Sequence, residues 1–253
     1  MLPAPFDNAL VLTGPTGSGK TGLGIELAEC LGTEIISMDS MALYRGMDIG
    51  TAKPGPAERD GVPHHLLDLW SVREPASVVE YARAARAEID RLRAAGTLPL
   101  LVGGSGLYVR AVVDDLEFPG TDPRVRARLE EELAAVGPAR LHERLATVDP
   151  DAAAAVLPSN GRRIVRALEV LELTGLPFRA RLPEPRPHYP VVGVALDREP
   201  AELDQRVAAR VERMWAGGWS RRWSGWSPRG CARGPPPPGR SGTPRCSTPS
   251  TAR

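Results

Sequence analysis

The segment Ala9-Leu-Val-Leu-Thr-Gly14-Pro-Thr-Gly-Ser-Gly-Lys-Thr21 decides the fold of this chain. A short apolar run ends at Gly14, and a helical repeat follows at Leu23, Leu27 and Leu31. The residues between them fit G-x-x-x-x-G-K-[ST], a pattern that requires a strand before the loop and a helix after it. The segment therefore predicts a phosphate-binding loop that opens an α/β unit.

Each part of the phosphate-binding loop has a chemical role. The glycines allow backbone N–H groups to converge on phosphate oxygens at the helix N-terminus. Lys20 supplies positive charge to the terminal phosphates, and the Thr21 hydroxyl is a candidate ligand for Mg²⁺. The loop predicts a ligand with a pyrophosphate group but does not identify it. The predicted phosphate contacts are Gly14, Pro15, Thr16, Gly17, Ser18, Gly19, Lys20 and Thr21.

Strand and helix patterns alternate further along the chain. Apolar strands are expected at residues 33–37, 98–102 and 191–196. The helix between the first two strands has an apolar face made of Val78, Tyr81, Ala82, Ala85, Ile89 and Leu92. This alternation is typical of a parallel sheet with its site at the carboxyl ends of the strands. We expect an α/β fold in which a P-loop parallel sheet is flanked by helices.

Residues 114–187 have a different pattern, because their apolar positions follow helical periodicity alone. Glycine and proline at Gly137-Pro138, at residues 158–161 and at Gly175 divide the region into successive helices. We interpret it as an all-helical insertion. It would lie between a first part of the core, residues 1–113, and a returning strand and helix, residues 188–218.

Residues 219–253 form a tail of aberrant composition. The chain has 32 basic and 31 acidic residues, yet no acid follows Glu212, and the tail has seven Arg but no Leu, Ile or Val. Such a tail is a basic RNA-binding arm, a Pro-rich ligand segment, or a translation in the wrong frame. Because Trp has one codon, restoring one nucleotide turns Trp219, Trp223 and Trp226 into Leu, Met or Val at helical spacing. We favour a frameshift near Gly218, which resequencing of the DNA tests.

Composition also indicates the cellular location of the protein and which single residues are informative. Only two lysines, Lys20 and Lys53, accompany thirty arginines, so a lysine that is retained inside a motif carries weight. No run of eighteen apolar residues occurs, and the N-terminus lacks a signal-peptide pattern. We expect a cytoplasmic protein without membrane contact. The three cysteines lack the number and spacing of a disulfide framework or metal site.

Asp39 follows the second expected strand, which places a carboxylate beside the phosphate-binding loop. Two functional roles compete for it: a partner of the metal, or a general base that accepts a proton from a nucleophile. A third interpretation is structural, because Asp and Ser favour the N-cap of a helix. The residues themselves leave all three open.

Four further segments resemble the tRNA dimethylallyltransferases, also called tRNA isopentenyltransferases. The likeness runs from about Ala9 to Gly218, and generic P-loop kinases do not share its longest segment. The four segments are Asp39-Ser-Met-Ala-Leu-Tyr-Arg-Gly-Met-Asp-Ile-Gly-Thr-Ala-Lys-Pro54, Val62-Pro-His-His-Leu-Leu-Asp68, Leu101-Val-Gly-Gly-Ser-Gly-Leu-Tyr108 and Arg162-Arg-Ile-Val-Arg-Ala-Leu-Glu169.

The resemblance implies transfer of a dimethylallyl group from dimethylallyl diphosphate to N6 of the adenine at position 37, beside a tRNA anticodon. Asp39 would deprotonate the adenine amine, a weak nucleophile because its lone pair is delocalised into the ring. Lys20, the loop amides and Mg²⁺ would stabilise the departing diphosphate. Ser105, where the family usually has Thr, would contact the extruded adenosine. The catalytic candidates are therefore Asp39, Lys20 and Ser105.

The resemblance also implies that the helical insertion grips the tRNA anticodon arm. Ala42 stands where many relatives have Gln, and His64 and His65 read as architectural. For any single Arg, a solvated helix face with intrahelical ion pairs is the competing interpretation. The candidate tRNA-binding residues are Asp39, Ser40, Met41, Ala42, Ser105, Arg126, Arg162, Arg163, Ile164, Val165 and Arg166.

Two other functions remain open at this point. In a small-molecule P-loop kinase, Asp39 would activate a hydroxyl group and ATP would be the donor. In an inactive tRNA-binding remnant, the aberrant tail would have cost the chain its activity. We expect a monomer in each case.

Overall fold

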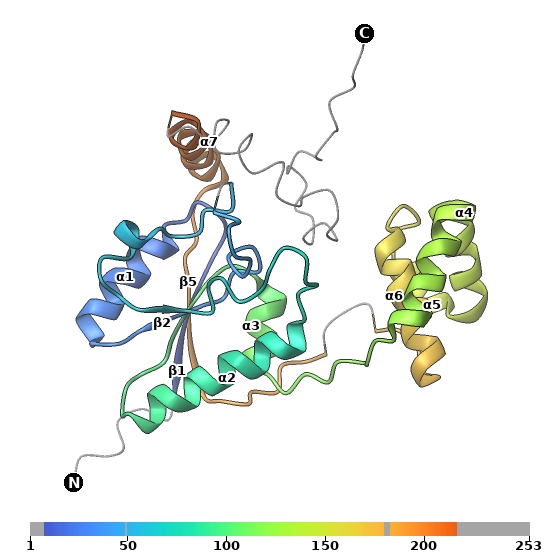
Figure 1. Ribbon diagram of the computed structural model, residues 1–253, viewed down its shortest axis with the longest axis horizontal. Helices are drawn as coiled ribbons and strands as arrows, with labels where there is room; N and C mark the ends of the chain where they lie inside the picture. Colours follow the sequence, from blue (N-terminus) through green and yellow to red (C-terminus); the bar gives the residue numbers. More distant parts are fainter. Residues whose placement is uncertain (1–7, 49, 180–182, 217–253) are drawn as a thin grey trace. The chain divides into compact units, whose positions relative to one another are not determined.

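The computed structural model describes residues 8–48, 50–179 and 183–216. The chain divides into two compact units. The first unit runs to Asp115 and resumes at Arg186, and the second unit is Leu116–Pro185 (Figure 1). Gly218 and the tail 219–253, for which a frameshift is expected, lie outside the described residues.

A parallel sheet forms the centre of the first unit, and its five strands among the described residues have the order β3-β2-β4-β1-β5. The expected strands are all present, the last three shorter by one or two residues, and they confirm the α/β class. The two-residue strand at His64–His65, which pairs with Ile35 and Ile36, was not expected. The strands are β1 (Ala9–Thr13), β2 (Ile35–Ser37), β3 (His64–His65), β4 (Leu100–Val102) and β5 (Val191–Ala195).

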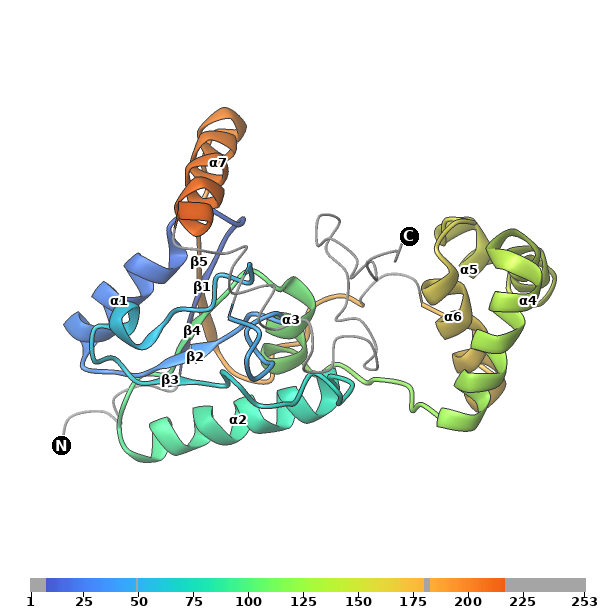
Figure 2. The same cartoon turned by 45° about the horizontal axis from the view of Figure 1, so that its top comes forward.

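Helices cover both faces of this sheet: α1 lies on one face, and α2 and α3 lie on the other (Figures 1 and 2). The Ser77 side chain caps α2 by accepting a hydrogen bond from the Glu80 amide, and the expected apolar face is buried except at Val78. No described helix is long and apolar enough to cross a membrane. The helices of this unit are α1 (Lys20–Leu31), α2 (Val78–Ala94), α3 (Gly106–Val113) and α7 (Pro200–Ala216), with a 3₁₀ turn at Pro56–Arg59.

The second unit consists of α4 (Pro123–Val148), α5 (Pro150–Ala155) and α6 (Gly161–Thr174). Gly137 interrupts α4 with a φ of 79°, just before Pro138, so α4 consists of two helices joined at a kink. The apolar core of this unit includes Leu129, Leu141, Leu145, Ile164 and Leu168. Its role in tRNA binding stays a prediction.

Candidate active site

The phosphate-binding loop joins the end of β1 to the start of α1 at Lys20. Gly14 adopts a φ of 144°, and a Cβ atom there would lie 2.5 Å from the Leu196 carbonyl oxygen. Only glycine fits this position. Lys20 Nζ donates hydrogen bonds to the carbonyl oxygens of Gly14 and Pro15, each at 2.7 Å. The cation is thus held over the loop, where the terminal phosphates of a ligand are expected.

Asp39 lies just beyond the carboxyl end of β2. Its Oδ1 accepts a hydrogen bond from the Met41 amide at 2.9 Å, and its carbonyl accepts one from the Ala42 amide at 3.2 Å. A turn rather than a helix follows, so the interpretation of Asp39 as a helix N-cap is wrong. No described residue bonds to the second carboxylate oxygen, which both functional roles require for a ligand.

Ser105 connects the end of β4 to the turn after Asp39. Its hydroxyl oxygen accepts a hydrogen bond from the Ser40 amide at 3.1 Å, and the hydroxyl donates to Ser40 Oγ at 3.2 Å. The two strand ends approach so closely that a Cβ atom on Gly103 would lie 2.3 Å from the Met38 carbonyl oxygen. Gly103 is required for this contact, which brings the two predicted catalytic side chains, of Asp39 and Ser105, to one edge of the sheet.

One cavity brings the phosphate-binding loop and Asp39 together. It is lined by a cation, two hydroxyl-bearing residues and a carboxylate, together with apolar side chains and the ring of His64. Burial lowers the pKa of His64, and its Nδ1 lies 2.9 Å from the Val62 carbonyl oxygen. The imidazole is therefore neutral at pH 7. The lining residues are Lys20, Thr21, Ile35, Ser37, Asp39, Ala42, Ala52, Pro54, His64, Val102 and Gly103.

Tyr81 supports this edge of the sheet from α2. It is fully buried, and its hydroxyl donates a hydrogen bond of 2.5 Å to the Ser37 carbonyl at the end of β2. Burial, with smaller contributions from Tyr108 and Asp39, raises its pKa, so it remains a neutral donor throughout the physiological range. The Tyr108 ring packs edge-on against it with centroids 4.7 Å apart. These contacts fix the strand end that carries Asp39.

Two arginines on α7 and the loop preceding it contact the phosphate-binding loop, and neither was predicted. Arg198 Nε donates to the Ser18 carbonyl at 2.9 Å, and Arg206 Nε donates to the Gly17 carbonyl at 2.8 Å. Glu202 lies between them and bonds to Arg198 Nη1 at 2.6 Å. Glu202 and Arg206 lie four residues apart on one face of α7, and Arg198 lies four residues before Glu202. This regular spacing is the signal that the sequence offered.

The predicted tRNA contacts of the second unit fall into three groups. Ile164 and Val165 are buried in its core, and their contact with tRNA stays a prediction. Arg162 and Arg163 lie exposed in the first turn of α6, and their role stays a prediction. Arg126 and Arg166 are engaged by the fully buried carboxylate of Glu169.

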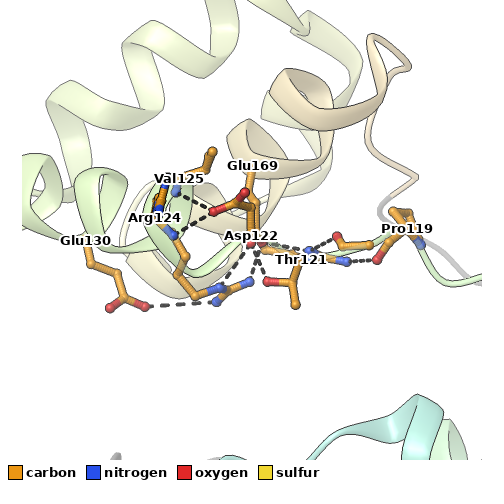
Figure 3. A network of polar contacts seen from close by, with 10 residues as sticks. Pro119, Thr121, Asp122, Arg124, Val125, Glu130 and Glu169 are labelled. Atoms are coloured by element: carbon orange, nitrogen blue, oxygen red, sulfur yellow. Dashed lines mark hydrogen bonds and ion pairs between the residues drawn. The ribbon is translucent and has the colours of Figure 1, made fainter.

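Glu169 organises a polar network that the sequence did not reveal (Figure 3). Its carboxylate accepts hydrogen bonds from Thr121 at 2.5 Å, from Arg166 at 2.7 Å and from Arg126. Burial opposes ionisation, but these three donors outweigh it and lower the pKa of Glu169. Arg166 also donates to the carbonyl oxygens of Pro119 and Gly120. The network therefore fastens the first residues of the unit to α6.

Known proteins are similar in sequence to this chain over most of its length. A family model described as IPP transferase matches residues 42–225. The chain belongs to the IPP transferase family. A tRNA dimethylallyltransferase from Salinispora arenicola is 64% identical over 209 residues, which are 83% of this chain and 61% of that protein. One from Streptomyces griseus subsp. griseus is 62% identical over 85% of this chain and 69% of that protein.

Solved structures of IPP transferases are similar as well. The full-length tRNA isopentenylpyrophosphate transferase of Bacillus halodurans has a TM-score of 0.58 and 39% identity, covering 89% of this chain and 71% of that one. A eukaryotic dimethylallyltransferase, described as acting on tRNA, has a TM-score of 0.71 and 25% identity, covering 87% of this chain and 57% of that one. This IPP transferase spans 61% of the length of the Salinispora arenicola relative, which is less than two thirds.

Proposed function

We propose that the chain is a tRNA dimethylallyltransferase, which transfers a dimethylallyl group from dimethylallyl diphosphate to N6 of the adenine at position 37, beside a tRNA anticodon. The observation that carries the proposal is a cavity lined by both the phosphate-binding lysine and Asp39. Membership of the IPP transferase family supports it. The small-molecule kinase loses support, because the named relatives are all tRNA-modifying transferases.

The reaction exchanges one bond to an allylic carbon for another. The bond between that carbon and the ester oxygen of the diphosphate breaks, and its electron pair leaves with the diphosphate. The bond to the adenine nitrogen forms, and the amine proton passes to the Asp39 carboxylate. Lys20 and the loop amides, with Arg206 beside Gly17, would bind the diphosphate and stabilise its developing charge.

Ser105 and the turn after Asp39 would orient the adenine. The Ser105 hydroxyl is already fixed by Ser40, so it is presented in one direction rather than several. A pre-oriented hydroxyl lowers the entropic cost of placing the amine in line with the allylic carbon. The neutral ring of His64 contributes a polar wall to the cavity that Asp39 lines.

The residues present fit a magnesium ion. Thr21 and Asp39 both line the cavity, and Mg²⁺ in phosphate sites is typically held by one or two protein oxygens together with substrate oxygens and water. Thr21 would hold the ion. When bound, it would neutralise charge on the diphosphate leaving group.

Labelled substrates distinguish the three functions. The chain is incubated with labelled dimethylallyl diphosphate, and separately with labelled ATP and a panel of small alcohols, each with and without unmodified tRNA. We expect label to enter tRNA from dimethylallyl diphosphate alone. Label passing from ATP to a small molecule would support a kinase. Retention of tRNA without transfer would support an inactive remnant.

A further inference from the structure

Lys53 carries a buried charge that the proposed reaction does not use. Its side chain is only 3% exposed, and it is one of two lysines in a chain with thirty arginines. An ammonium group that leaves water is tolerated only when its charge is compensated and its N–H groups find acceptors. The surroundings of Lys53 meet both conditions.

Three oxygens from separate points of the chain surround the ammonium group. Lys53 Nζ donates to the Tyr44 carbonyl at 2.6 Å, to Asp48 Oδ1 at 2.7 Å and to Asp68 Oδ1 at 2.5 Å. An ammonium group has three N–H donors, and each has one acceptor here. Arginine would replace this compact group by a planar fork with a different donor geometry. The geometry thus accounts for a lysine at this position.

The ammonium group joins the two stretches that form one side of the cavity. Ala52 and Pro54, the neighbours of Lys53, line the cavity, and so does Ala42 at the end of the turn that begins with Asp39. The Asp68 amide donates to the Ala42 carbonyl at 3.1 Å. Lys53 therefore binds the wall at residues 52–54 to the turn that carries Asp39.

The backbone is strained at one residue of this wall and at one residue that Lys53 contacts. Ala52 has a φ of 58° and Asp68 also has a φ of 58°, a left-handed conformation that residues with a side chain adopt at a cost. Ala52 directly precedes Lys53, and Asp68 itself accepts a hydrogen bond from Lys53. The ammonium group compensates this cost by holding the Asp68 carboxylate and the Tyr44 carbonyl in place.

We propose that Lys53 is a positioning residue: its buried ammonium group fixes the turn after Asp39 and the wall at residues 52–54 in the geometry that the transfer reaction needs. This inference rests on the proposed function. Lys53 itself is not among the residues that line the cavity. A displacement of the general base of about 1 Å is enough to slow a reaction about 100-fold.

The kinetic test compares Lys53→Met with Lys53→Arg and with Arg45→Met. Arg45 is a matched control, because it is a second cation that bonds to this segment. Its guanidinium group donates to the Asp68 and Leu69 carbonyls, but its side chain is 57% exposed. Below the unfolding temperature of every variant, kcat and the KM for dimethylallyl diphosphate are measured with tRNA. We expect kcat/KM to fall about 10- to 100-fold in Lys53→Met. Lys53→Arg should recover part of this, and Arg45→Met should stay within about threefold of the wild type.

A purely structural role gives a different kinetic result. It would lower the unfolding temperature and the active fraction, but the folded enzyme would keep its KM. Equal kcat/KM values for Lys53→Met and the wild type would overturn the proposal. An equal loss in Arg45→Met would overturn it as well, because the buried position of Lys53 would then be irrelevant.

Hydrogen exchange tests the same positioning without turnover. Three backbone hydrogen bonds join the turn after Asp39 to the segment that holds Asp68. The Arg45 amide donates to the Trp70 carbonyl, the Asp68 amide to the Ala42 carbonyl and the Trp70 amide to the Leu43 carbonyl. In Lys53→Met the three amides should exchange about tenfold faster or more, while α4 and α6 of the other unit stay unchanged. Unchanged exchange at these three amides would refute the restraint, even for a wild type that transfers nothing. Failure of the wild type to transfer refutes the proposed function alone.

Discussion

Replacement of Glu169 by Gln tests what holds the helical unit together. The Glu169 side chain is fully buried, and its carboxylate compensates the positive charges of Arg126 and Arg166 while it accepts from Thr121 (Figure 3). Gln keeps the shape of the side chain and removes its charge. Two guanidinium groups would then face a neutral amide, one end of which is itself a donor.

The size of the expected destabilisation follows from the burial of the Glu169 carboxylate. Breaking a buried ion pair costs about 3–5 kcal/mol when one partner is left uncompensated. Arg126 and Arg166 are 36% and 27% exposed, so their guanidinium groups recover part of their hydration in the variant. We therefore expect the free energy of unfolding of the helical unit to fall by about 2–3 kcal/mol. For a unit of this size this is a shift of about 2 M in the urea midpoint.

Glu172 offers a matched control on the same helix. It pairs with Arg128, but its side chain is 39% exposed, and exposed pairs contribute about 0–1 kcal/mol. All five Trp of the chain lie outside residues 116–185. Fluorescence therefore reports the first unit, and far-UV circular dichroism reports the helices of both. We expect Glu169→Gln to move only the dichroism transition; equal urea midpoints for the two Gln variants would refute the argument.

Acid should reproduce the effect of the Gln variant in the wild type. The pKa of Glu169 is lowered in the folded protein, because the hydrogen bonds from Thr121, Arg166 and Arg126 outweigh the effect of burial. A lowered pKa stabilises the fold fully above the unfolded value of 4.5, and this stability is lost as the pH falls through the lower folded value. The urea midpoints of wild type and Glu169→Gln should therefore converge below pH 4.5 and differ most near pH 7.

Three further predictions concern the first unit. Asp39→Asn should lower kcat for transfer about 100- to 10,000-fold with little change in the Kd for tRNA, and an active variant would remove the general-base assignment. Lys20→Met should raise the KM for dimethylallyl diphosphate and lower kcat; unchanged kinetics would contradict its role at the diphosphate. Gly103→Ala should lower the thermal midpoint because its Cβ would clash with Met38, whereas Gly106→Ala, with open space around its Cβ, should not; equal midpoints would contradict the close approach.

The order of strands and helices in the first unit could be predicted because each element carries its own pattern. An apolar run marks β1, and a heptad-like repeat marks the buried face of α2. Two residues are too few for a pattern, so β3 could not be seen. His64 and His65 form a strand only because Ile35 and Ile36 offer them a free edge.

The candidate site was predictable for a related reason. Parallel strands end at the same edge, so the phosphate-binding loop, Asp39 and Ser105 had to lie near one another once the fold class was known. The network in the second unit follows no such rule. Arg126 and Arg166 carry the same charge pattern as solvated arginines, and only the fold shows that both meet a carboxylate with no exposed surface.

The contacts of Arg198 and Arg206 show how the site depends on residues beyond the insertion. Both arginines come after the chain has returned from the helical unit, 180 and 189 positions after the loop residues that they contact. Val207 packs against Gly17, where a Cβ atom would lie 3.1 Å from its methyl group, so α7 meets the loop through side-chain packing as well as through charge. The phosphate-binding motif is one short segment of sequence, but the residues that hold it in place lie far from it in the chain. A motif match at residues 14–21 therefore predicts where a diphosphate binds, whereas the rigidity of that site depends on the docking of α7.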